Sequence, residues 1–585
     1  MRRAAPLPLL LFAWFIAAPH CAAAEPDPLR LVPDSADLVI QLRQPRKTLE
    51  LGVGLASMQE LRGFNQYREL FDSTAFNRFQ QLVAHFEKEL GAPWPELVDR
   101  LAGGGIVAAV RTGEGNQPAM LVVQGRDAAL TRRFLQAARN VLQQELARQE
   151  SKDEIKETQI SGVEVLRVGD GLLACALDDA LVLSNVDRGV AAAIELHQES
   201  KKVRGITQLS RFKEARQHAH ADCLAWGWLN LERVRQAPNL QDLQKFPGPL
   251  SPLYVFIGGW LDVARRAPYA TASLRLDASG RHVLGLSLPR GTDDMPAVLA
   301  RMHAPPPGQP GVLPPLMPPG TLFSHSFYLD LHEFWQKRDR ILTGEQLDAL
   351  EEANKAASPF LLATRFGDII DKLGARHRLV ATTQAASGYK TVPLVRIPSL
   401  AFVGELSDPE GFSQKVEPPL RAIGLLAALN VKMTYFEEKH GQHRIVGYRF
   451  AEDQANRDVA NGILFNFSPC FVRVGDKFIL STTLELARSL VEELEKEKAS
   501  PSANLSAAQR TSLGWQGVGA FLGSFREQLV TQIILQDGVG RADAEQQIQS
   551  LLDFLGRLGG VEGELVYGTN SFTWNFTFVP PAGSR

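Results

Sequence analysis

The sequence predicts an α+β fold with two similar halves, each consisting mainly of antiparallel sheet packed with amphipathic helices. Short apolar strands alternate with helical stretches, turn-forming residues separate neighbouring strands, and the same landmarks recur in the same order along the chain. We therefore divide the chain into a signal peptide at 1–24, a first α+β half at 25–290, a proline-rich linker at 291–320 and a second α+β half at 321–585.

The first elements follow from apolar periodicity. A short strand is expected from Asp37 to Leu42, where the chain leaves into a turn that contains proline. Further on, Leu82, Phe86 and Leu90 recur every four residues, which places three apolar groups on one face of a helix.

A hairpin and a second helix are expected next. The apolar runs 105–110 and 120–123 flank a turn-rich segment at 112–116, which favours antiparallel pairing. Asp127 stands where a helix N-cap is expected. The helical stripe after it consists of Leu130, Phe134, Ala138 and Val141.

The rest of the first half repeats strands and turns. Short strands between 163 and 183 are separated by turns at 169–171 and 178–179. The remaining expected segments are a helix at 188–196, strands at 223–231 and 254–263, and hairpin turns at 277–280 and, in the second half, 568–571.

The linker and one late helix have distinctive compositions. Eight prolines lie between Pro305 and Pro319, and they favour an extended spacer because proline fixes φ and lacks an N–H donor. A helix is expected to begin near Leu484 and to end in the charged run 492–498, which we interpret as a solvated surface.

Five landmarks support an internal duplication. The paired segments are 31–34 with 316–319, 96–101 with 368–373, 121–127 with 402–408, 177–184 with 474–481, and the alternating strand of Leu284, Leu286 and Leu288 with that of Trp574, Phe576 and Phe578. Their spacing shifts as insertions in surface loops would make it shift. We predict two copies and not a solenoid of many units.

The N-terminus has the three parts of a secretory signal peptide: Arg2 and Arg3, an apolar run from Leu7 to Ala18, and small residues before Glu25. This run is short for a membrane span, and no later apolar run predicts a transmembrane segment in the mature chain. We expect export to the periplasm, the cell envelope or the extracellular space. Lipid attachment at Cys21 remains an alternative.

Composition excludes some classes of protein. The chain is 45% hydrophobic and 22% charged, as globular proteins are, and its net charge of -2 argues against nucleic-acid binding. After cleavage only Cys175, Cys223 and Cys470 remain, which is too few for a disulfide scaffold. We expect them to be small buried apolar residues.

The sharpest chemical pattern is formed by His218, His220 and Asp222. On a strand these side chains would project from one face, and all three are types that bind metals. The pattern resembles the opening of the His-x-His-x-Asp-His motif of metallo-β-lactamase-like hydrolases, but Cys223 replaces the last histidine. The alternative, which we favour, is a polar turn that leads into a strand.

Other candidates are weaker. Asp178 and Asp179 could be paired catalytic acids, but the second copy has glycine and aspartate at the matching bend, which fits a hairpin turn. His440 and His443 are spaced like metal ligands but are expected in an exposed turn. No Walker A, G-x-S-x-G, H-E-x-x-H or EF-hand motif occurs. We assign no catalytic, cofactor-binding or metal-binding residues and expect no cofactor.

The tryptophans allow another possibility. Alternation predicts that most of them are core residues, but outward-facing ones would allow a ligand groove between the halves. The residues concerned are Trp226, Trp228, Trp260, Trp515 and Trp574.

The segments 31–39 and 177–185, with the helix that begins near Arg188, resemble an uncharacterised class of exported bacterial proteins built from domains of unknown function. This resemblance implies a cell-envelope or extracellular location and supplies no catalytic residues.

The function predicted from the sequence is a non-enzymatic binding or structural role in the cell envelope, with an unknown protein or small ligand as partner and without nucleic acid. The alternative is an exported hydrolase, with or without a metal ion, whose site lies between the halves.

Overall fold

The computed structural model describes residues 26–54, 74–236, 263–289, 302–306, 308–384, 388–499, 507–567 and 571–581. The predicted signal peptide, Trp260, the predicted strand at 254–263 apart from its last residue, and most of the turn at 568–571 lie outside these residues. The chain divides into two compact units, Met1–Thr48 with Leu82–Lys213 and Leu49–Gln81 with Glu214–Arg585. The predicted halves, which rest on sequence likeness, are a different division and stay a prediction.

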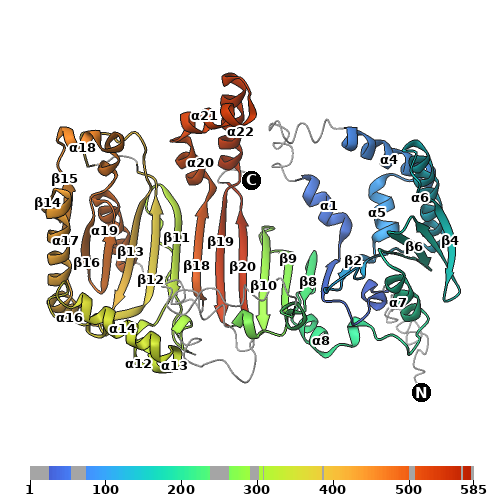
Figure 1. Ribbon diagram of the computed structural model, residues 1–585, viewed down its shortest axis with the longest axis horizontal. Helices are drawn as coiled ribbons and strands as arrows, with labels where there is room; N and C mark the ends of the chain where they lie inside the picture. The colour runs from blue at the N-terminus through green and yellow to red at the C-terminus, as the bar shows by residue number, and fades with distance from the viewer. Residues whose placement is uncertain are drawn as a thin grey trace, which may run out of the picture. The chain divides into compact units, whose positions relative to one another are not determined.

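The first unit contains an antiparallel sheet with the strand order β1-β2-β3-β7-β6-β5-β4. Its strands β2, β4 and β6 are labelled in Figure 1. Its strands are β1 (Leu38–Leu42), β2 (Gly105–Val110), β3 (Ala119–Gln124), β4 (Ile155–Ile160), β5 (Val163–Val168), β6 (Leu172–Leu177) and β7 (Ala180–Ser184). Between residues 28 and 217, the structure describes the helices η1 (Pro28–Leu31), α1 (Pro45–Gly54), α4 (Thr74–Leu90), α5 (Trp94–Ala102), α6 (Ala128–Arg148), α7 (Asp187–His197), η2 (Ile206–Gln208) and α8 (Ser210–Gln217).

The second unit contains a larger antiparallel sheet with the order β8-β9-β10-β20-β19-β18-β11-β12-β13-β17-β16-β15-β14. Its strands are β8 (Ala225–Leu229), β9 (Ala270–Leu276), β10 (His282–Pro289), β11 (Thr321–Tyr328), β12 (Leu373–Thr382), β13 (Ser399–Leu406), β14 (Met433–His440), β15 (His443–Phe450), β16 (Cys470–Val474), β17 (Lys477–Ser481), β18 (Ala507–Gly514), β19 (Gly560–Tyr567) and β20 (Ser571–Val579). The predicted α+β class with mainly antiparallel sheet is therefore confirmed.

The helices of the second unit lie between and beside these strands. They are α9 (Leu231–Val234), α12 (Leu331–Gln336), α13 (Arg338–Ile341), α14 (Gly344–Ala357), α15 (Phe366–Ile370), α16 (Pro409–Lys415), α17 (Glu417–Val431), α18 (Gln454–Asp458), η5 (Val459–Asn466), α19 (Leu484–Ala499), α20 (Trp515–Gly523), α21 (Arg526–Asp537) and α22 (Arg541–Arg557).

Alternation along the strands of the second unit gives the sheet two apolar faces. Val403, Ile479 and neighbouring side chains on one face are buried against α19. On the opposite face, Phe471 and Phe478 pack with residues of α16 and α17. Two layers of helices are therefore needed to cover the two faces of this part of the sheet.

A cap-and-ion-pair junction occurs once in each unit. Asp127 caps α6 by accepting from a backbone N–H of its first turn, and the guanidinium of Arg100 lies 2.6 Å from the same carboxylate. Asp408 likewise caps α16, and the ammonium of Lys372 lies 2.8 Å from it. Hydrogen bonds from these cations and from the backbone lower the pKa of both carboxyl groups. The sequence landmarks 96–101 and 368–373 supply the cations, but the duplication itself stays a prediction.

Most of the other local predictions are confirmed. The strand at 37–42, the hairpin of β2 and β3, the N-cap at Asp127 and the helix at 188–196 are present, and β9 and β10 turn at 277–280. The predicted strand at 223–231 is shorter, Ala225–Leu229. In the described part of the linker the backbone is non-helical from 311 to 320, but it is packed, since the Val312 N–H donates to the Ala507 carbonyl at 2.9 Å.

We predict that Asp127→Ala lowers the free energy of unfolding by about 1 kcal/mol, because α6 loses its N-cap hydrogen bond. The ion pair to Arg100 is lost as well. Since the pKa of Asp127 is lowered by folding, its contribution is present at neutral pH and is lost as the pH falls below the unfolded value near 4. Urea denaturation at pH 7 measures the effect.

The control is Asp170→Ala, which removes an exposed carboxylate from the turn between β5 and β6. Equal unfolding free energies for the two variants would show that the junction does not stabilise α6.

Candidate functional site

The metal-ligand pattern does not form the expected geometry. His218, His220 and Asp222 lie exposed in the turn region between α8 and β8, so they do not project from one face of a strand. Across the described ranges, no group of three or more histidine, cysteine, aspartate or glutamate residues is placed to hold a metal ion. The interpretation of this segment as a polar turn that enters a strand is the one that fits the structure.

Cys175, Cys223 and Cys470 are buried, as expected, and none of them forms a disulfide within the described residues. Burial raises the pKa of the Cys175 thiol to about 12 and that of the Cys470 thiol to about 12. Because the thiolate is the nucleophilic form, these two residues are inert core groups at neutral pH.

The paired aspartates occupy a hairpin turn, whereas the two histidines are the last residue of β14 and the first of β15 and are half-buried, not exposed in a turn as expected. Asp178 has a φ of 53° between β6 and β7, and Gly475 has a φ of 59° at the matching bend between β16 and β17. A left-handed backbone favours residues such as glycine and aspartate. The geometry of the turn therefore explains these residue types, and no catalytic role is needed to explain them. His440 and His443 close the hairpin of β14 and β15, where each lies beside a glutamate of α19.

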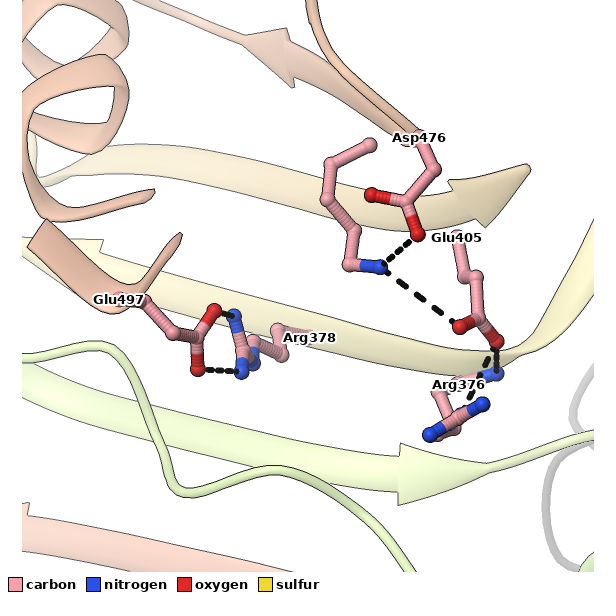
Figure 2. A network of polar contacts seen from close by, with 6 residues as sticks. Arg376, Arg378, Glu405, Asp476 and Glu497 are labelled. Carbon is pink, nitrogen blue, oxygen red and sulfur yellow. Dashed lines mark hydrogen bonds and ion pairs between the residues drawn. The ribbon is translucent and has the colours of Figure 1, made fainter. Parts of the chain in front are cut away.

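Figure 2 shows a polar network on the face of the sheet that α19 covers. It comprises three cations and three carboxylates: Arg376, Arg378, Lys477, Glu405, Asp476 and Glu497. The Arg378 side chain is 4% exposed and forms two hydrogen bonds, of 2.9 and 2.5 Å, with the carboxylate of Glu497. The charged run at the end of α19 is therefore not wholly solvated, since one of its glutamates neutralises a buried guanidinium.

The remaining ions of the network are paired in the same way. Glu405 accepts from Arg376 at 3.1 Å and lies 3.6 Å from the ammonium of Lys477, which also lies 2.8 Å from Asp476. The hollow beside these residues has a volume of about 10 Å³, enough for one water molecule. This network is structural, because every charge has a partner and no ligand fits beside it.

We predict that Glu497→Ala lowers the free energy of unfolding by about 3 kcal/mol, because it leaves the Arg378 guanidinium buried without its counter-ion. The double variant Arg378→Met with Glu497→Leu should recover most of this loss, since it removes both charges. Urea denaturation of the single and double variants measures the difference.

Glu493→Ala is the matched control on the same helix. Its carboxylate pairs with Lys496, whose side chain is 71% exposed, so the expected loss is below about 0.5 kcal/mol. A loss as large as that of Glu497→Ala would contradict the assignment.

A polar groove of about 450 Å³ lies over β18, β19 and β20 beside Pro314 and Pro315. Its arginines are paired across the strands: Arg510 lies 2.6 Å from Glu564, and Arg281 lies 3.8 Å from Glu562. Because the cations and carboxylates of this groove neutralise one another, it offers little net charge to an ionic ligand.

An open apolar hollow lies on the face of β11, β12, β13 and β17 that is opposite α19. Its volume is about 530 Å³. We define the apolar hollow by the five large side chains that line it: Phe323, Leu379, Leu400, Phe402 and Leu480. Strand register explains their grouping, because Leu379 pairs with Phe402, which pairs with Leu480. The Leu400 and Leu480 side chains are about half exposed, at 53% and 48%.

The polar groups of the apolar hollow are few. Its lining contains no ionisable side chain. The Ser481 hydroxyl donates to the Thr483 carbonyl at 2.8 Å, and the Thr482 hydroxyl accepts from the Leu400 N–H at 2.8 Å. The wall thus has an apolar surface with one partly exposed hydroxyl, that of Thr482, at its edge.

A stack of rings continues from the apolar hollow along β11. The His325 ring lies between Phe323 and Phe327, with centroid distances of 6.0 and 5.4 Å, and its Nδ1 lies 2.8 Å from the Thr511 hydroxyl. Burial lowers the pKa of His325 to about 4. The ring is therefore neutral at physiological pH and adds no charge beside the apolar hollow.

We predict that the protein loses stability as the pH falls from about 6.5 toward 4. In this range the unfolded chain binds a proton at His325 and the folded chain does not, so the free energy of unfolding decreases. His303, whose pKa burial also lowers to about 4, contributes in the same direction. Urea denaturation at several pH values should show a smaller dependence for His325→Phe than for the wild type, and an unchanged dependence would contradict the assignment.

Sequence reasoning missed the apolar hollow. The landmark at 402–408 was interpreted as a strand that leads into a helix, and apolar residues on the strands were expected in the core. The available signal was that 399–406 and 477–481 place apolar residues on both faces of a strand.

Known proteins show little similarity to this chain. No protein-family profile and no curated protein matches the sequence. Among solved structures, the chain is similar to one described as "Structure of crystal form I of TP0453", with 12% identity, coverage of 46% of this chain and 82% of that chain, and a TM-score of 0.24. A similarity at this level supports no argument about function.

None of the described helices combines the length and the hydropathy that a membrane span requires.

Proposed function

We propose that this protein is an exported, non-enzymatic binding protein that holds the aliphatic chain of a lipid-like ligand in the apolar hollow. The observation that supports this proposal is the hollow itself, about 530 Å³ of open space with a wall of large apolar side chains. This volume lies within the range of about 300–1,000 Å³ that is typical of ligand pockets.

The chemistry of the wall selects the ligand class. A peptide or sugar would lose its hydrogen bonds to water and find few replacements, which costs about 1–3 kcal/mol for each unpaired group. An alkyl chain has no such groups, and each buried CH₂ contributes about 0.8 kcal/mol. The Thr482 hydroxyl at the edge of the apolar hollow suits a single polar head group that stays near solvent.

The same features support a binding role over a catalytic one. A reaction needs a nucleophile, an acid or base, or a metal near the bound molecule. Among the described residues, the lining of the apolar hollow has no acidic, basic or metal-binding side chain, and its two hydroxyls, those of Ser481 and Thr482, are hydrogen-bonded to backbone groups. The charged groups of the network in Figure 2 neutralise one another.

Export and internal duplication belong to the same proposal. Export is supported by the sequence pattern of residues 1–24. Duplication is supported by the strand order β1-β2-β3-β7-β6-β5-β4, which matches β11-β12-β13-β17-β16-β15-β14, and by the junctions at Asp127 and Asp408.

We predict that the protein binds cis-parinaric acid with an increase in its fluorescence and that palmitate displaces it. Leu400→Glu should weaken binding about tenfold or more, because it places a carboxylate in the wall of the apolar hollow. Fluorescence titration of the mature protein measures both affinities.

Leu535→Glu is the matched control, since this leucine of α21 is 80% exposed and does not line the apolar hollow. Its affinity should equal that of the wild type. Absence of binding to the wild type, or equal weakening by both variants, would refute the proposal.

A further inference from the structure

The outer surface of α17 is apolar. Leu425, Leu426 and Leu429 are 52%, 49% and 72% exposed, and Ile423 is 37% exposed. The inner side of the helix is occupied by Ala428, which is buried, and by Gly424, which lies against the ring of Tyr448. A helix on the surface of a globular protein normally has polar residues on its outer side. Apolar residues on both the inner and the outer side are typical of a helix that is buried on both sides.

The corresponding helix of the first unit differs. The helix α6 connects β3 and β4, and α16 and α17 connect β13 and β14, which hold the same places in the two matching strand orders. The outer surface of α6 is polar, with the exposed residues Arg132, Arg133, Gln136, Asn140, Gln143, Gln144 and Arg148. Leu142, at 37%, is its one exposed large apolar side chain. The apolar outer surface of α17 is therefore not a requirement of this position in the fold.

We propose that the outer surface of α17 binds a second copy of this chain through antiparallel packing of the two α17 helices. Ala422, Leu425, Leu426 and Leu429 follow the spacing i, i+3, i+4 and i+7, which is the pattern that packs helix against helix. Such a surface can be self-complementary, as a twofold-symmetric interface requires.

The area is sufficient for a dimer. Tyr435 on β14 is 47% exposed and packs edge-on against Tyr448, beside α17. Together with the four exposed residues of α17 it forms a patch of roughly 500 Å², which is the size that marks an interaction site. Two such patches bury roughly 1,000 Å², the lower bound for a specific interface.

The helix dipoles favour the antiparallel arrangement. It places the positive N-terminus of each α17 beside the negative C-terminus of the other, whereas parallel packing would place like ends together. Glu417 takes no part in this, because it pairs with Arg421 of its own helix.

An anionic membrane is the other occupant that an apolar helix surface suits, and the vesicle measurement below distinguishes it from a second copy.

The test is the mass of the mature protein in analytical ultracentrifugation over a hundredfold range of concentration. The wild type should sediment as a dimer that dissociates on dilution. Leu429→Glu should weaken dimerisation at least tenfold, and Leu425→Asn, a milder change, should weaken it less, both with unchanged circular dichroism spectra because these side chains are exposed.

Two matched variants should remain dimeric. Leu142→Glu introduces the same charge on the outer surface of α6, and Leu400→Glu introduces it in the apolar hollow. Because mass reports dimerisation and fluorescence reports ligand binding, this inference and the proposed function fail separately.

Three outcomes would overturn the inference. These are a wild type that is monomeric at every concentration, a dimer that persists in Leu429→Glu, and a monomer that binds phosphatidylcholine–phosphatidylglycerol vesicles through α17. Loss of the dimer in Leu400→Glu would place the interface at the apolar hollow and would overturn it as well.

Discussion

The strands of the second unit carry apolar side chains on both faces of the sheet, so both faces must be covered. Over β12, β13, β15, β16 and β17 one face is buried against α19, through residues such as Leu490 and Val491. The other is covered only in part, by α12 and α13 near Phe327 and by α16 and α17 near Phe478. The strands between these helices retain exposed apolar side chains, and the apolar hollow is a part of the sheet that the described helices leave uncovered.

The helix α17 also has apolar surface that is left uncovered. Its inner side covers the sheet, while its outer side is apolar and exposed. The first unit has the same strand order and a capped helix in the same position, yet the outer surface of that helix is polar. The units therefore share the features that form the sheet and its helix junctions. They differ in the surfaces that we assign to the ligand and to the second copy.

Local features of the fold could be predicted from the sequence because they depend on neighbouring residues. The N-cap at Asp127, the left-handed turn at Asp178 and the buried cysteines follow from residue type and spacing. The pairing of Arg378 with Glu497 could not be predicted, since 119 residues separate them. Nor could the apolar hollow, because strand periodicity shows which residues share a face but not whether a helix covers that face.

A crystal structure of the mature protein with a fatty acid that carries bromine at its terminal carbon would locate the bound ligand. An anomalous bromine peak is expected in the apolar hollow, within contact distance of Leu400 and Leu480. A peak elsewhere, or a helix of a neighbouring copy seated on these strands in solution and crystal alike, would contradict this expectation.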